Sequence, residues 1–185
     1  MTTDIEYRVE RPCDRAAVLR VHARAFGDHG RKVGELLEAL SESPAELPEL
    51  SIVAARGREV IGHAAVTKSL LDAPERLVDV AVLSPLGVLP EEQGRGVGSE
   101  LVRRAVAATA EAGWPLLFLE GDPGYYSRLG FEAAGGHGFR RPSLRIPEPA
   151  FQVVRLAAHE PWMTGTLVYA EPFWHHDCVG LRDTI

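Results

Sequence analysis

Apolar residues in the first fifty positions follow two different periods. Residues 5–9 alternate between apolar and polar, which predicts a strand. Asp14 is placed to cap a helix, and the apolar residues after it recur at helical spacing: Ala17, Val18, Val21, Ala25 and Phe26. After the break at GDHGRK, an apolar face predicts a second helix: Val33, Leu36, Leu37 and Leu40. The chain is therefore predicted to open with one strand and two amphipathic helices.

The rest of the chain alternates strands with helices. A hairpin is predicted over residues 50–66 with its turn at 56–59, and a long strand over 78–89. A helix follows the glycines of residues 94–98 and ends near Gly113, and residues 114–120 read as a short buried strand. Asp122 and Pro123 predict the start of a short helix, and residues 151–158 and 165–174 read as two closing strands. With neither repeats nor a linker, residues 1–185 are predicted to form one α/β domain.

Composition narrows the classes of protein that this chain can be. Twenty basic and 26 acidic residues give a net charge of −6, which argues against nucleic acid as a partner. No apolar run reaches the length of about 20 residues that a membrane helix needs. The polar, acidic start predicts no signal peptide, and only Cys13 and Cys178 are present, which predicts a reducing compartment. We therefore expect a cytoplasmic protein without a membrane partner.

Three glycines between a strand and a helix raise the question of a ligand. Gly94, Gly96 and Gly98 lie where a helix begins, and amides at a helix N-terminus bind phosphate groups. A P-loop would need a lysine that this loop lacks. A dinucleotide-binding loop would need a third glycine where Ser99 stands. The spacing thus predicts a phosphate site of another kind.

The strand before the loop indicates which ligand carries the phosphate. Pro85 and Gly87 interrupt residues 78–89, where a regular strand rarely accepts either residue type. Such a strand would separate from its neighbour and leave main-chain groups free to pair with an extended amide ligand. A diphosphate joined to an extended amide arm describes coenzyme A.

These residues resemble a known family. The stretch Gln93-Gly94-Arg95-Gly96-Val97-Gly98 fits the [RQ]-x-x-G-x-[GA] motif of the GNAT acetyltransferases. With LSPLGVLP before it and YYSRLGF after it, the chain is most similar to the YhbS-like branch of bacterial N-acetyltransferases. The resemblance implies a mixed, mostly antiparallel sheet that is splayed around acetyl-CoA and flanked by helices.

The resemblance also implies roles for individual residues. Backbone groups of Leu86, Gly87 and Val88 would hold the pantetheine arm and the thioester. After Gln93, which opens the motif, main-chain amides would hold the pyrophosphate: Gly94, Arg95, Gly96, Val97, Gly98 and Ser99. Tyr126 matches the tyrosine that protonates the departing thiolate in many relatives, and Cys13 and Cys178 lie too near the chain ends for an acetyl-cysteine route.

The general base departs from the family pattern. Val82 and Ser84 stand at the two positions where several relatives carry a glutamate or a histidine, and neither takes up a proton at neutral pH. The base is therefore displaced onto Asp79, Glu120 or His63, or it is a chain of water molecules. EGDPG also replaces the asparagine-containing motif that is common before the tyrosine. No metal site is expected, because the adjacent residues of 175–178 point apart on an extended segment.

The sequence as a whole predicts an acetyl-CoA-dependent N-acetyltransferase that works by direct transfer to a primary amine. The acceptor is a small molecule or a protein that the sequence does not identify, and the oligomeric state stays open, a homodimer included. Two other readings remain: an acyl-CoA sensor without turnover, and an enzyme that uses a longer acyl-CoA.

Overall fold

The computed structural model describes residues 4–182, which form two compact units. Unit 1 contains residues 4–67 and 83–108, and unit 2 contains residues 68–82 and 109–182. Strands β3 (Glu59–Asp72) and β4 (Leu77–Val88) and helix α3 (Val97–Glu111) each run from one unit into the other. The prediction of a single domain over residues 1–185 stays a prediction.

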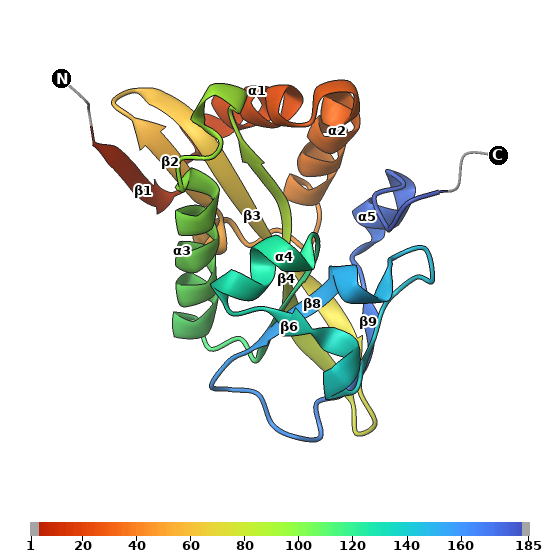
Figure 1. The fold of residues 1–185 in the computed structure, drawn as a ribbon. Helices are drawn as coiled ribbons and strands as arrows, with labels where there is room; N and C mark the ends of the chain where they lie inside the picture. The colour runs from red at the N-terminus through yellow and green to blue at the C-terminus, as the bar shows by residue number, and fades with distance from the viewer. Residues whose placement is uncertain (1–3, 183–185) are drawn as a thin grey trace. The chain divides into compact units, whose positions relative to one another are not determined.

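Unit 1 combines a sheet with three helices. Its other elements are β1 (Ile5–Val9), α1 (Arg15–Ala25), α2 (Gly30–Ser41) and β2 (Ile52–Arg56). The strand order is β1-β2-β3-β4, and β1 pairs antiparallel with β2, as β2 does with β3 (Figure 1). The apolar period along the sequence predicted each of these elements.

Helices α1 and α3 lie on opposite faces of β3. A Cβ on Gly62 would lie 2.9 Å from Leu101 and 3.3 Å from Val97, both on α3. The next residue, His63, is hydrogen-bonded to His22 on α1. Because neighbouring residues of a strand point to opposite faces, the sheet of unit 1 is covered by α3 on one side and by α1 on the other.

Unit 2 adds shorter elements around the two shared strands. They are β5 (Leu116–Glu120), α4 (Pro123–Tyr126), β6 (Glu132–Ala133), β7 (Phe139–Arg140), β8 (Phe151–Arg155), β9 (Gly165–Val168) and α5 (Glu171–His175). The β4–β5 and β7–β9 pairs are parallel, whereas β5–β8, β6–β8 and β3–β9 are antiparallel. The fold is the predicted mixed, mostly antiparallel sheet with flanking helices.

Two local predictions differ from the structure. The hairpin strand predicted to end at residue 66 continues to Asp72, so residues 73–76 are all that separates it from β4. The closing strand predicted over residues 165–174 ends at Val168, and helix α5 follows. Pro172 lies in the first turn of α5, where its fixed φ and missing N–H favour a helix start over a strand.

The close packing of α2 on α1 supplies a stability test. A Cβ on Gly30 would collide with the Ala23 carbonyl oxygen and lie 2.7 Å from the Ala23 Cα. Gly30→Ala should therefore lower the free energy of unfolding by about 1–3 kcal/mol, measured by urea denaturation. Gly34→Ala is the control, because its Cβ would lie 4.0 Å from Leu19 and its helix position favours alanine. Equal effects of the two substitutions would contradict this account of the helix contact.

Candidate active site

The loop of residues 93–96 presents open backbone at the start of α3. Gly94 has φ +72° and Gly96 has φ +84°, a conformation that favours glycine. Both are exposed, and a Cβ on either would meet no atom of the described chain within 4 Å. The Glu100 amide donates to the Gly96 carbonyl at 3.0 Å, which closes the first turn of α3. The start of a helix carries partial positive charge, so this surface suits an anion.

Two ion pairs hold the 3-10 turn Pro90–Glu92 that leads into this loop. The buried Glu92 carboxylate receives two hydrogen bonds from Arg56 of β2, which lower the pKa of Glu92. The exposed Glu91 receives two from Arg24 of α1, at 2.9 and 3.1 Å. The turn of residues 90–92, which precedes the loop, is therefore held by one ion pair to β2 and another to α1.

The end of β4 lies directly before this turn. Gln93 donates from its side-chain amide to the Val88 carbonyl at 3.0 Å, which joins the loop to the strand. The Leu89 amide donates to the Ile61 carbonyl of β3 at 2.9 Å. The other edge of β4 pairs in parallel with β5. Within residues 4–182, the described pairs are Ala81–Leu117 and Val82–Phe118. Leu86, Gly87 and Val88 thus follow the paired part of that edge.

Gly87 is a glycine because a histidine ring lies against it. A Cβ at this position would lie 2.7 Å from His22 Nδ1 and 2.9 Å from His22 Cε1. The sequence had suggested a close backbone approach here, and the group that approaches is a side chain of α1. Any larger residue at position 87 would displace the ring or the strand.

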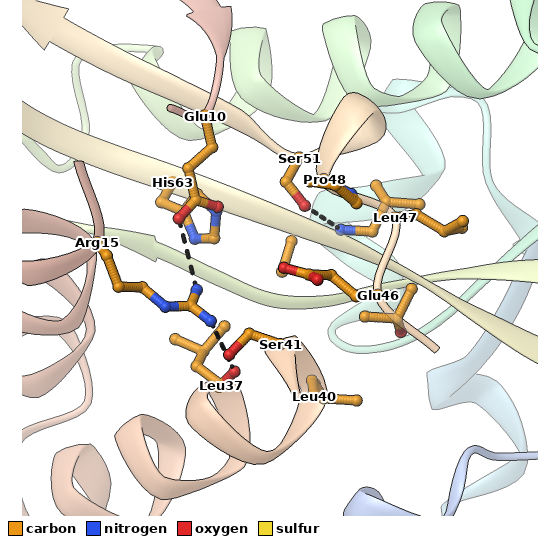
Figure 2. A pocket seen from close by; sticks show the side chains of 13 residues that line it. Glu10, Arg15, Leu37, Leu40, Ser41, Glu46, Leu47, Pro48, Ser51 and His63 are labelled. Atoms are coloured by element: carbon orange, nitrogen blue, oxygen red, sulfur yellow. Dashed lines mark hydrogen bonds and ion pairs between the residues drawn. The ribbon is translucent and has the colours of Figure 1, made fainter. Parts of the chain in front are cut away.

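His22 is the first member of a buried chain of polar groups. His22 Nε2 lies 2.9 Å from His63 Nδ1, and His63 Nε2 lies 3.1 Å from Glu10 Oε2. Both histidines are fully buried, and Glu10 is half-buried. Glu10 also forms an ion pair with Arg15 at 3.4 Å (Figure 2). His22 Nδ1 is buried and has no hydrogen-bond partner within the described residues. This network of three side chains thus ends beside Gly87, at a nitrogen that has no partner within residues 4–182.

Burial and neighbouring charges set the protonation of this chain. Burial, followed by the charges of His63 and Arg15, lowers the pKa of His22 well below its ordinary value, so His22 is neutral. Burial alone would raise the pKa of Glu10. The hydrogen bond from His63 and the charges of His63 and Arg15 outweigh that effect, and the pKa of Glu10 is lowered. Glu10 is therefore ionised at neutral pH.

Tyr126 lies in unit 2, at the end of α4. Asp122 caps this helix by accepting a hydrogen bond from the Gly124 amide at 2.8 Å, as the sequence predicted. The Tyr126 ring packs on Gly121, where a Cβ would clash with it, and lies edge-on to Phe131. Burial, with a smaller effect of Tyr125, raises the pKa of Tyr126 to about 12. At neutral pH the phenol is thus a proton donor.

The other base candidates lie in two different environments. Asp79 forms an ion pair with Lys68 at 2.9 Å and is 57% exposed, as expected of a surface pair. Glu120 accepts a hydrogen bond from the Gly180 amide at 3.3 Å. Burial raises the pKa of Glu120 and outweighs the lowering by Gly180 and Arg145. Glu120 is therefore a carboxylate whose burial favours its protonated form.

The predicted site residues are distributed over both units. Unit 1 contains residues 86–88, the loop 93–99 and His63, whereas unit 2 contains Tyr126, Glu120 and Asp79. In residues 4–182, no three histidine, cysteine or carboxylate side chains are grouped as a metal site would require. None of the helices in this range is long and apolar enough to cross a bilayer.

His22 and Glu10 were not among the predicted site residues. The signal for His22 was present, because it falls on the apolar face of α1, four residues after Val18. A histidine on a buried helix face needs a polar partner, but the sequence could not identify that partner 41 residues away on β3.

The chain is similar to known acetyltransferases. The family model described as an acetyltransferase (GNAT) domain matches residues 6–134. The uncharacterized N-acetyltransferase YjhQ of Escherichia coli K12 is 32% identical over 163 residues, which cover 86% of this chain and 88% of YjhQ. YhbS of the same strain, also an uncharacterized N-acetyltransferase, is 32% identical over 170 residues, 90% of this chain and 96% of YhbS.

Solved structures of similar proteins contain the cofactor. The crystal structure of Escherichia coli YhbS in complex with CoA has a TM-score of 0.81 and 30% identity, over 94% of this chain and 93% of that one. The crystal structure of a GNAT family acetyltransferase from Brucella melitensis in complex with acetyl-CoA has a TM-score of 0.73 and 31% identity. The match covers 92% of this chain and 99% of that one.

The depressed pKa of His22 predicts how stability depends on pH. In the unfolded chain His22 takes up a proton below about pH 6.5, whereas burial of the ring, with the charges of His63 and Arg15 nearby, keeps it neutral in the folded protein. The unfolded state then binds more protons, so the free energy of unfolding should fall by up to about 1.4 kcal/mol per pH unit from about pH 6.5 to pH 5. His22→Gln should show a shallower slope in urea denaturation over this range. An unchanged slope would contradict the assignment of His22 as a buried neutral group.

Proposed function

The chain belongs to the GNAT family of acetyltransferases, and we propose that it transfers the acetyl group of acetyl-CoA directly to a primary amine. The observation that carries this proposal is the open glycine loop at the start of α3, joined by Gln93 to the end of β4. The two similar structures that contain CoA or acetyl-CoA support the choice of cofactor. No metal is assigned to the reaction.

The glycine loop is the proposed diphosphate site. Main-chain amides of Gly94, Arg95, Gly96, Val97, Gly98 and Ser99 would face the phosphate oxygens. Support comes from the open space around Gly94 and Gly96, where ligand oxygens can approach the backbone without meeting a side chain. The partial positive charge at the start of α3 adds to the attraction. Gln93 and the Arg56–Glu92 pair would position the loop for the ligand.

The end of β4 is the proposed position of the pantetheine arm and the thioester. The last described pair between β4 and β5 is Val82 with Phe118, and Leu86, Gly87 and Val88 come after it along β4. An extended amide can pair with such an edge as another strand would. The thioester would then lie at the backbone of Gly87, and main-chain N–H groups there would stabilise negative charge on its carbonyl oxygen.

Direct transfer requires one nucleophile and one proton donor. The neutral amine nitrogen attacks the thioester carbonyl carbon, a C–N bond forms, and the C–S bond breaks when the tetrahedral intermediate collapses. The amine loses one proton, and the departing thiolate gains one. Tyr126 is the proposed donor, because its raised pKa keeps the phenol protonated at neutral pH, so a proton is present for the departing sulfur.

The acceptor is proposed as a class, a small-molecule or protein amine in the cytoplasm. The net charge of −6 favours a cationic amine in a general way. A sensor that binds acyl-CoA without turnover would use residues 86–99 and not Tyr126. Thiol release from acetyl-CoA over a broad amine panel separates the sensor from the enzyme, and competition between acyl-CoAs of different length identifies the donor.

The phosphate assignment leads to a paired test on two glycines. Gly96 (φ +84°) and Gly113 (φ +81°) have almost the same backbone conformation, and a Cβ on either meets open space. Alanine at either position should therefore cost a similar amount of stability, about 1–2 kcal/mol. Only Gly96→Ala should weaken acetyl-CoA binding, by at least about tenfold in calorimetry, or about 1.4 kcal/mol. Parental affinity in Gly96→Ala would exclude the loop as the diphosphate site.

The acid assignment can be tested on the two adjacent tyrosines. Tyr126→Phe keeps the ring packing on Gly121 and removes the proton, so acetyl-CoA affinity should hold while turnover falls by about 10²-fold. Tyr125→Phe should leave turnover near normal, because adjacent side chains on a helix point about 100° apart. Single-turnover acetyl transfer with one common acceptor compares them. Equal rates for the parent and Tyr126→Phe would disprove the assignment, and a larger loss at Tyr125 would transfer it to that residue.

A further inference from the structure

A cavity of about 480 Å³ lies in unit 2 and is lined by residues of β7, β9 and the segment 141–151. Protein pockets that hold small molecules have volumes of about 300–1,000 Å³. The lining shares no residue with the proposed cofactor site at 86–88 and 93–99, nor does it include Tyr126. The cavity is thus large enough for a small molecule, and the proposed function has assigned it no ligand.

The floor of this cavity is aromatic. Phe139 and Phe151 line it and are otherwise buried, at 2% and 1% exposure. Phe118 of β5 packs on both rings, edge-on to Phe139 at 5.1 Å between centroids and stacked on Phe151 at 5.6 Å. Leu144 also belongs to the lining and is exposed. The apolar part of a ligand would therefore be removed from water against a base of packed rings.

Two consecutive arginines line the same cavity. Neighbouring residues of a strand point to opposite faces, but β7 ends at Arg140, so Arg141 is not bound by that alternation. Arg140 Nε donates to Thr166 Oγ1 of β9 at 2.9 Å, which fixes the position of the guanidinium. Within residues 4–182, this neutral hydroxyl is the described partner of Arg140, so no carboxylate there neutralises its charge.

Arg141 is the unsatisfied group of the cavity. Its Nε is buried and has no hydrogen-bond partner within residues 4–182. Its ion pair with Glu148 spans 3.9 Å, longer than a hydrogen bond, and the Glu148 side chain is 77% exposed. So exposed a pair contributes little, and it does not explain why the Arg141 side chain is only 24% exposed. A guanidinium in this state can receive a carboxylate through two parallel hydrogen bonds.

The charges of the lining favour a monoanion. Two arginines and one glutamate leave the lining with a net charge of +1. One carboxylate neutralises that charge, whereas a phosphate dianion would place excess negative charge beside Glu148. The chain as a whole carries −6, so this positive charge is local and does not belong to a general basic surface.

We propose that this cavity is a binding site for a small carboxylate with an apolar body. The carboxylate lies against the guanidinium of Arg141, Arg140 adds its charge, and the apolar body covers Phe139 and Phe151. Glu148 excludes ligands that carry a second negative charge. The carboxylate belongs either to the amine acceptor or to a second molecule, and both share this chemistry. The site itself does not depend on the proposed function.

Titration of the full-length, ¹⁵N-labelled protein with matched probes tests the site directly. The probes 3-phenylpropanoate and 3-phenylpropanamide share their size and ring and differ in charge. The carboxylate should shift the Nε–H resonance of Arg141 saturably, because it binds the guanidinium that carries this N–H. The amide should bind at least about tenfold more weakly, because it lacks the charge. Acetate should also bind more weakly than 3-phenylpropanoate, because it has no apolar body to bury.

Substitution of the arginines identifies the group that holds the carboxylate. Arg141→Gln should lower the affinity for 3-phenylpropanoate by about 10–100-fold and leave that for the amide unchanged. Arg140→Gln should lower it less. Arg155→Gln is the matched control, because Arg155 is in unit 2, pairs with Glu132 at 3.1 Å and lies outside the lining. Equal affinities of the parent for carboxylate and amide, parental affinity in both folded cavity variants, or an equal loss in Arg155→Gln would overturn the site.

Thiol release from acetyl-CoA then shows which molecule the site serves. L-Phenylalanine and 2-phenylethylamine differ by one carboxylate. If the site holds the acceptor, phenylalanine should have the lower KM, and Arg141→Gln should remove that preference without slowing 2-phenylethylamine. If a second molecule occupies it, 3-phenylpropanoate should still bind and Arg141→Gln should change neither KM. Both results support the site and assign its occupant. Failure of the proposed function is distinguishable, because the parent would then not bind acetyl-CoA in calorimetry, whereas the titration needs no acetyl-CoA.

Discussion

Two glycines on neighbouring strands, Gly62 of β3 and Gly87 of β4, allow side chains from both faces to lie directly against the sheet of unit 1. A Cβ on Gly62 would press on Leu101 of α3 and would lie 3.4 Å from the Gly87 carbonyl oxygen. A Cβ on Gly87 would collide with His22 of α1. Because packed interiors leave no room for an added methyl group, both positions restrict how α1 and α3 can lie. The start of α3 and the position of the His22 ring both depend on this constraint.

Polar interactions then fix what the packing has brought close. Arg56 and Glu92 hold the turn before the glycine loop, and Gln93 ties that loop to the carbonyl of Val88. On the other face, the half-buried Glu10 carboxylate contacts the His63 ring, and the His63 ring contacts the His22 ring. Such networks rigidify a site when they are satisfied, and a single open position within them is where a ligand or a proton can act. In this network, His22 Nδ1 has no hydrogen-bond partner within residues 4–182.

In unit 2, a glycine again makes room for a side chain that packs directly on the backbone. Gly121 leaves room for the Tyr126 ring, and the Asp122 cap begins the short helix that carries it. Burial, more than any neighbouring charge, raises the pKa of this phenol to about 12. Burial also makes His22 a neutral group, so desolvation sets opposite roles for two side chains: one keeps its proton, and the other is kept without one. A family motif could not have indicated the direction of either pKa shift, because both depend on burial in the folded chain.

The sequence by itself determined the elements whose apolar period is long, and the glycine loop between β4 and α3. It placed the helices of unit 1 and the Asp122 cap correctly, because both signals depend on residues a few positions apart. It did not detect β6 and β7, which have two residues each, and it read α5 as a strand. Only the tertiary structure brought Glu10, His22 and His63 together. Their contacts join α1, β3 and the residue that follows β1 across 41 and 53 residues, and no local pattern encodes which strand residue a buried histidine will meet.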